Sequence, residues 1–223
     1  MSLSHFPLSA LTAEQIQSLV ANSVRESRDL EYKREYSLRD DAQKREFSKD
    51  ISALANTMGG DLLYGVEDND GIAAAVTGIP LLREDEERLR IESLLATGLS
   101  PRLSGLGFKT IPLDANNVVF IIRVPRSLNA PHMVTYNGDN RFYGRHSTGK
   151  FIMDVHQVRE SFVEADAVVN KLKSFRESRL KWIAQNEVGA RLPSPHIVVV
   201  HLLPLSSLRD GPLFDGRALR MIP

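Results

Sequence analysis

Residues 53–68 read ALANTMGGDLLYGVED, and this stretch decides the fold. Its first part ends an amphipathic helix that we expect over residues 40–57. Gly59 and Gly60 stop the helix, and the mostly apolar run 61–66 follows as a buried strand. The apolar face of the helix is predicted to consist of Phe47, Ile51, Leu54 and Met58. A helix, a tight turn and a buried strand in this order predict an α/β or α+β fold, a mixed β-sheet flanked by helices.

Helix and strand patterns continue on both sides of this stretch. Residues 29–36 alternate as a strand, with Leu30 and Tyr32 on one face and Glu31 and Lys33 on the other. Further elements are expected as helices at 12–24 and 83–95, a strand at 72–77, and hairpins at 106–124 and 132–143. A helix capped by Asp154 and Gln157, followed by a separate helix over 166–184, would complete the domain as a C-terminal helical hairpin.

The chain is expected to divide into three parts. Residues 1–165 form the main domain, 166–187 a helical extension, and 188–223 a linker and the start of an incomplete second module. The apolar strand expected at 196–203 motivates the third part, because about twenty residues rich in turn formers are all that follow it. The alternative is that this strand joins the main sheet.

Composition excludes several classes of protein. The 223 residues carry 28 basic and 28 acidic side chains, so any polyanion must be bound by a local patch. The absence of cysteine excludes disulfides, thiolate metal sites and thiol nucleophiles. There is no signal-peptide pattern and no apolar run long enough to span a membrane, so we expect a cytoplasmic protein with no membrane partner.

A group of acidic residues near the first strand has the residue types that metal-dependent phosphodiester hydrolysis requires. Glu31 and Lys33 share a strand face, and Glu26 lies just before the strand. Carboxylates are the ligands that Mg²⁺ or Mn²⁺ prefers for phosphodiester hydrolysis, and a lysine stabilises the developing charge. Asp68 reaches this group only if the chain turns at Glu67, because it otherwise follows the alternation of the buried strand. Ordinary surface ion pairs are the alternative interpretation.

Two motifs resemble the Schlafen-type AlbA domain, a family described as nucleic-acid-binding. Residues 26–33, ESRDLEYK, and 53–60, ALANTMGG, are similar to its two signatures, and the likeness covers roughly 23–162. In the members that cleave RNA, two glutamates and an aspartate form the metal site. The resemblance therefore implies catalytic and metal-binding roles for Glu26, Glu31 and Asp68, with Lys33 alongside. Many relatives are described only as binding proteins or regulators.

The same resemblance bears on assembly. Schlafen nucleases build their nucleic-acid channel from two copies of such a fold, whereas this chain shows one copy. A homodimer would supply the second copy.

A glycine-rich basic segment, residues 144–150, fits the first seven positions of a phosphate-binding P-loop. The eighth position should be Ser or Thr, and Phe151 stands there instead, so ATP binding is a distant alternative. The favoured interpretation is a nucleic-acid contact in which cations meet phosphates and an aromatic ring stacks on a base. The predicted contact residues are Arg141, Tyr143, Arg145, His146 and Lys150. A solvated loop is the alternative.

The sequence thus predicts binding of DNA or RNA as the main function. A metal-dependent endoribonuclease using Glu26, Glu31 and Asp68 is the first alternative, and it alone calls for a Mg²⁺ or Mn²⁺ cofactor. A protein interaction or assembly domain is the second.

Overall fold

The computed structural model describes residues 3–184 and residue 200 of the chain. These fall into two compact units, with the division between Ser161 and Phe162. The three-part division stays a prediction. None of the helices in the described part combines the length and apolar character needed to cross a bilayer.

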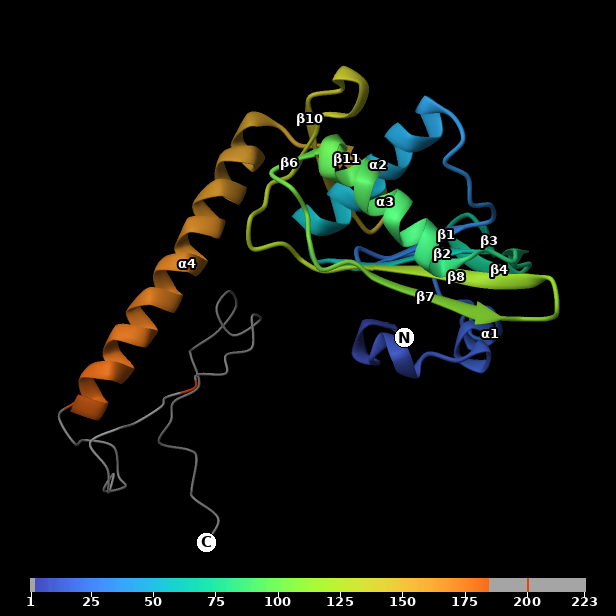
Figure 1. Ribbon diagram of the computed structural model, residues 1–223, viewed down its shortest axis with the longest axis horizontal. Helices are drawn as coiled ribbons and strands as arrows, with labels where there is room; N and C mark the ends of the chain where they lie inside the picture. The colour runs from blue at the N-terminus through green and yellow to red at the C-terminus, as the bar shows by residue number, and fades with distance from the viewer. Residues whose placement is uncertain (1–2, 185–199, 201–223) are drawn as a thin grey trace, which may run out of the picture. The chain divides into compact units, whose positions relative to one another are not determined.

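A five-stranded mixed sheet forms the centre of the first unit (Figure 1). Its main path runs β1 (Leu30–Lys33), β2 (Gly60–Tyr64), β8 (Asn117–Val124) and β5 (Ile79–Pro80), and β7 (Gly107–Pro112) pairs with β8. The pair β1–β2 is parallel, and the other pairs are antiparallel. The expected mixed sheet is confirmed.

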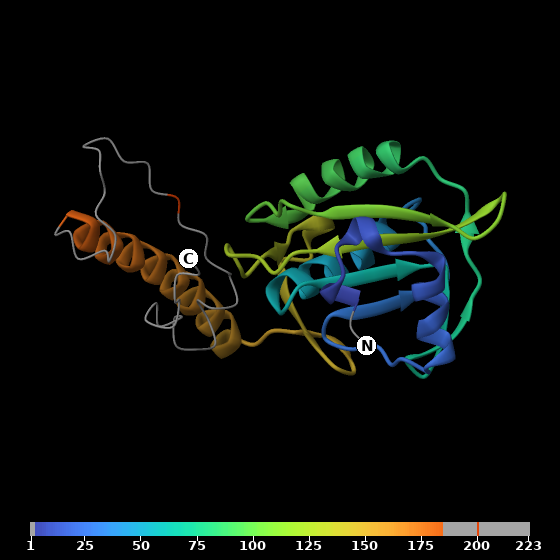
Figure 2. The same cartoon turned by 90° about the horizontal axis from the view of Figure 1, so that it is seen from below.

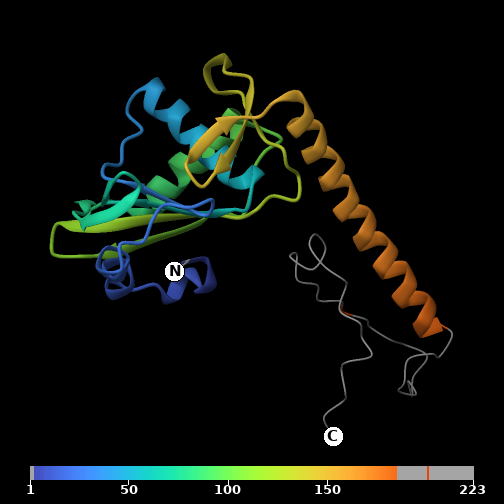
Figure 3. The same cartoon turned by 180° about the vertical axis from the view of Figure 1, so that it is seen from behind.

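Helices cover both faces of this sheet. α2 (Asp41–Asn56) and α3 (Glu84–Gly98) lie on one face, and α1 (Ala13–Ala21) lies with the N-terminal segment on the other (Figures 1 and 3). Short 3₁₀ turns occur at Leu3–His5, Leu8–Ala10 and Tyr136–Gly138. Two apolar cores result, one on each side of the sheet.

The double covering explains why β2 reads as an unbroken apolar run. Leu62 and Tyr64 pack into the core beneath α2, while Leu63 packs into the core beneath α1. Gly60 starts the strand with φ +147°, and a Cβ there would lie 2.4 Å from the carbonyl oxygen of Asp29. Only glycine lets the two segments approach this closely.

Two smaller sheets complete the unit, and Figure 2 shows the strands from below. One contains β6 (Leu99–Ser100), β9 (Met133–Val134), β10 (Arg141–His146) and β11 (Gly149–Ile152). The other pairs β3 (Val66–Asn69) with β4 (Ile72–Val76).

Three expectations need correction or lie outside the described residues. One continuous helix, α4 (Val155–Ala184), replaces the predicted helical hairpin, because nothing between its ends breaks the helix. Met58 is 55% exposed and does not belong to the apolar face of α2, because the helix has already ended. The strand expected at 196–203 lies outside the described residues except for residue 200.

Candidate functional site

Strand β1 places Glu31 and Lys33 on one face, as the alternation predicts. Leu30 and Tyr32 point into the core beneath α1. On the opposite face, Lys33 Nζ lies 2.6 Å from Glu31 Oε1.

The hairpin of β10 and β11 brings two further cations to this face. Arg145 and Lys150 are opposite each other in the antiparallel register, so both side chains leave the same side of the hairpin. The guanidinium of Arg145 forms an ion pair with Glu31 and donates to the carbonyl oxygens of Ser27 (3.0 Å) and Leu30 (3.3 Å). Arg145 is only 2% exposed.

Helix α2 contributes the balancing carboxylates. Lys150 Nζ forms an ion pair with Glu46 and lies 2.5 Å from Asp50 Oδ1. Asp50 Oδ2 also lies 3.9 Å from Lys33 Nζ, and Asp50 is 3% exposed. We refer to these six side chains as the charge network: Glu31, Lys33, Glu46, Asp50, Arg145 and Lys150.

Three acids and three bases make the charge network electrically balanced. Burial raises the pKa of Asp50, although Lys150 and Lys33 both pull it down. Burial alone would lower the pKa of Lys150, but Asp50 and Glu46 outweigh that effect and raise it. The lysines therefore stay protonated and paired, and the network joins β1, α2 and the hairpin into one body.

Glu26 and Asp68 lie beside the network and bind backbone amides. Glu26 Oε1 accepts from the Tyr32 amide at 2.8 Å, and Asp68 Oδ2 accepts from the Gly71 amide at 3.0 Å. Burial, and next the charge of Glu31, raise the pKa of Glu26, with a smaller contribution from Asp68. Glu26 thus lies close enough to Glu31 and to Asp68 for both charges to disfavour its ionised form.

Asp68 is positioned by two local irregularities that the sequence only partly indicated. Gly65 has φ +93° and ends the alternation of β2, so Val66 packs beneath α1 rather than beside Tyr64. The register of β3 then shifts between Glu67 and Asp68, the point at which the chain had to turn for Asp68 to reach the Glu31 face.

The glycine-rich segment is a β-hairpin and not a P-loop. Ser147 and Thr148 form a two-residue turn between β10 and β11, with His146 opposite Gly149. A P-loop instead leads directly into a helix whose N-terminus holds the phosphate. Lys150, which would reach that phosphate, is bound to carboxylates of α2.

The structure separates the five predicted nucleic-acid contacts. Tyr143 is 5% exposed and donates its hydroxyl to Asp139, so its ring is not open to a base. Arg145 and Lys150 belong to the charge network. Arg141 and His146 are exposed. Their roles in binding stay predictions.

A family model described as Schlafen, AlbA_2 matches residues 26–154, more than half of the chain. The chain belongs to the Schlafen AlbA_2 family. The match includes the whole charge network, Glu26, Asp68 and the hairpin. Among curated protein sequences, none matches this chain.

Two solved structures are similar to it at low identity. The DIP2311 protein from Corynebacterium diphtheriae is 17% identical with a TM-score of 0.43, over 66% of this chain and 27% of its own. The N-terminal domain of a RecG-related protein from Nitrosomonas europaea is 18% identical with a TM-score of 0.43, over 61% of this chain and 88% of its own. The chain thus spans about a quarter of the first of these proteins.

The metal implied by RNA-cleaving Schlafen members does not fit the arrangement of these side chains. Both oxygens of Glu31 face cations, Lys33 and Arg145, and Glu26 and Asp68 each bind a backbone amide. Within the described residues, no group of three or more His, Asp or Glu side chains is arranged to hold an ion. No catalytic step through a metal follows from this geometry.

Sequence reasoning missed three residues of the Schlafen AlbA_2 site. Asp50 follows Phe47 by three positions, a spacing that places a charge on the buried face of α2. Asn56 stands in the second motif, and its amide donates to the Tyr143 and His132 carbonyl oxygens at 2.9 and 3.0 Å. Arg28 stands in the first motif and is exposed, and its guanidinium has no hydrogen bond or ion pair within the described residues.

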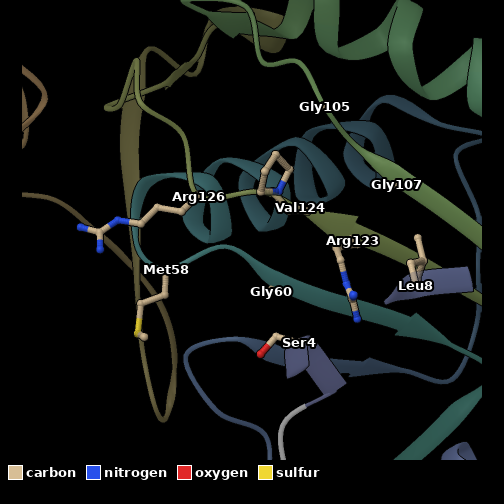
Figure 4. Close-up of a pocket in the computed structure, with 10 residues that line it drawn as sticks. Ser4, Leu8, Met58, Gly60, Gly105, Gly107, Arg123, Val124 and Arg126 are labelled. Carbon is tan, nitrogen blue, oxygen red and sulfur yellow. The ribbon is translucent and has the colours of Figure 1, made fainter. Parts of the chain in front are cut away.

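A pocket of about 370 Å³ lies near the N-terminal segment (Figure 4). Its Arg123 is held by Asp61 at 2.7 and 2.8 Å and by the carbonyl oxygens of Leu3 and Phe6. In Figure 4, Met58 and Arg126 lie away from Arg123, toward the other side of the view. None of the predicted site residues lines this pocket.

Proposed function

We propose that this Schlafen AlbA_2 protein binds nucleic acid on the surface where Arg28 and the tip of the β10–β11 hairpin are exposed. The observation that carries the proposal is the combination of this family membership with an exposed cation beside the hairpin, Arg28, which has no ion pair among the residues that the structure describes. Arg28 lies beside the hairpin because the carbonyl oxygen of its neighbour Ser27 accepts a hydrogen bond from Arg145. Arg145 directly precedes His146, the last residue of β10 before the tip.

Phosphate binding requires cations that internal carboxylates have not already neutralised. Lys33, Arg145 and Lys150 are paired with acids, so we assign them to holding the hairpin in place. Arg28 meets the requirement, and the exposed hydroxyls of Ser147 and Thr148 add hydrogen-bond donors at the hairpin tip.

A gel-shift assay tests the proposal. Labelled tRNA, single-stranded RNA and duplex DNA are incubated with the protein at low salt, with Mn²⁺ or with EDTA. Arg28→Ala is compared with Arg39→Ala, which removes the same charge from another exposed position. Arg39 lies just before the N-terminus of α2. The sixteen residues of α2 separate the two ends by about 24 Å.

We expect a shifted band that Arg28→Ala weakens and Arg39→Ala leaves unchanged. An equal effect of both substitutions would reject this surface while keeping nucleic-acid binding. No shift with any probe at low salt would reject the function and favour a protein interaction domain.

Metal-dependent cleavage of RNA is the second candidate. What supports it is the proximity of Glu26 to Glu31 and Asp68, whose charges add to the effect of burial in raising the pKa of Glu26. To hold an ion, these carboxylates would have to leave the cations and backbone amides that they contact in this structure. Asp68→Asn is the suitable variant, since Asp68 is exposed and lies outside the charge network. Cutting in Mn²⁺ that Asp68→Asn abolishes would make the protein a nuclease, and intact probes in Mn²⁺ would contradict this candidate.

A further inference from the structure

The β10–β11 hairpin has an outer face that the charge network does not use. Arg145 and Lys150 leave one side of the hairpin, and the alternation of side chains sends His146 and Phe151 to the other. Gly144 is opposite Phe151, and Gly149 is opposite His146. The outer face near the tip therefore carries two aromatic rings and two glycines.

Gly144 allows Phe151 to lie flat against the strand. A Cβ at Gly144 would lie 2.7 Å from Phe151 Cζ and 3.0 Å from Cε1, closer than such atoms approach. Any other residue would push the ring away from the backbone. The glycine thus permits the Phe151 ring to lie in this position.

The ring of His146 stacks on Phe151 and is otherwise open. The two ring centroids are 4.0 Å apart, and the planes differ by 10°. His146 is exposed, and its ring has no hydrogen bond or ion pair within the described part of the chain. Phe151 therefore covers one face of the His146 imidazole ring, and the rest of the ring is exposed.

We propose that His146, backed by Phe151, is a stacking platform for an unpaired base of single-stranded nucleic acid. The inference rests on the proposed function and adds the class of ligand. Each base of a duplex is already stacked between its neighbours, so only an unpaired base can lie on the ring. Arg28 and the hydroxyls of Ser147 and Thr148 would contact the adjoining phosphates.

Fluorescence anisotropy with two matched probes tests the platform. One probe is a labelled 12-nucleotide oligothymidylate, and the other has the same backbone with abasic sites throughout. An oligouridylate of equal length and a duplex of the thymidylate extend the series. The proteins are the wild type, His146→Ala, His146→Phe, which keeps a flat ring, and His5→Ala, which removes an exposed histidine elsewhere.

We expect the wild type to bind the thymidylate about tenfold more tightly than the abasic probe, as base–aromatic stacking gives. In His146→Ala the two probes should bind equally well, whereas His146→Phe and His5→Ala should keep the tenfold difference in affinity. The duplex should bind less tightly than the single strand. A 2-aminopurine base in the single strand should be quenched by the wild type and not by His146→Ala.

Two results would overturn the inference in distinguishable ways. If the single strands bind but the ratio is the same in His146→Ala, the platform is wrong and the proposed function stands. If no probe binds, duplex included, the platform and the proposed function both fail.

Discussion

Removing the guanidinium of Arg145 should destabilise the protein strongly, because this side chain is buried and its head group is paired with a carboxylate and two backbone carbonyl groups. Its guanidinium pairs with Glu31 and donates to two backbone carbonyl groups, those of Ser27 and Leu30. Arg145→Met keeps most of the apolar stem and removes the charge and the donors. The variant therefore measures what the head group contributes.

The structure sets the size of the effect. Breaking a buried ion pair by removing one partner typically costs about 3–5 kcal/mol, because the other charge stays buried. Lys33, which lies 2.6 Å from Glu31, is not changed by the substitution and can still pair with it, so the loss should be near the low end, about 3 kcal/mol. With a urea m-value of about 2 kcal/mol/M, the unfolding midpoint falls by roughly 1.5 M.

Urea unfolding followed by far-UV circular dichroism measures this change. Arg141→Ala is the control, since it removes an exposed arginine from the same strand and should cost less than about 1 kcal/mol. The double variant Glu31→Gln/Arg145→Met should be more stable than the sum of the two single losses predicts, because no lone charge is left buried.

A loss below about 1 kcal/mol in Arg145→Met, with an unchanged m-value, would refute a structural role for Arg145. Strict additivity in the double variant would contradict the coupling between Glu31 and Arg145.

Three further predictions concern pH, backbone space and assembly. The raised pKa of Glu26 means that the folded state binds more protons than the unfolded state between the two pKa values, so stability falls as pH rises through that interval. Glu26→Gln should therefore raise the melting temperature at pH 7. The gain should disappear below about pH 4, because Glu26 is then protonated in the unfolded state too, where its pKa is about 4.3. An unchanged melting temperature at pH 7 would contradict this. Gly60→Ala should cost more than about 2 kcal/mol in urea unfolding, because its Cβ would meet Asp29, whereas Gly138→Ala, with nothing within 4 Å, should cost about 1 kcal/mol; equal losses would show that the contact does not matter. Light scattering should give twice the mass of one chain if the expected homodimer forms, and a monomer mass at all concentrations would reject it.

Short-range signals predicted the starts of two helices correctly. Thr12 with Gln15 forms a capping box at α1, and Asp154 with Gln157 caps α4 by reciprocal hydrogen bonds. Such contacts involve residues three positions apart, so the local sequence contains all the information needed. The separate helix expected from Asp166 is wrong, because the helix that begins at Val155 continues through this position without a break.

The face of each β1 residue was also predictable, whereas the partners of Arg145 and Lys150 were not. Alternation placed Glu31 and Lys33 together. Arg145 meets Glu31 and Lys150 meets Asp50 across about a hundred residues of chain, and that pairing depends on how the hairpin docks on α2. The basic segment therefore resembled a free phosphate site, although two of its cations are neutralised in the structure.

The outer face of the hairpin could not be predicted from the sequence either. Phe151 counted against a P-loop in the sequence, but its stacking with His146 depends on the register that puts Gly144 opposite it. That register follows from the two-residue turn between the strands, which a search for a phosphate-binding loop passes over.

The salt dependence of single-strand binding tests the central claim most directly. Anisotropy titrations with labelled oligouridylate at several salt concentrations are compared for the wild type, Arg28→Ala and Arg39→Ala. We predict binding at low salt and a slope of log K against log salt that shrinks by about 0.7 in Arg28→Ala alone, the value for one lost phosphate contact on a single strand. No binding by the wild type at low salt, or identical slopes in all three proteins, would contradict the account.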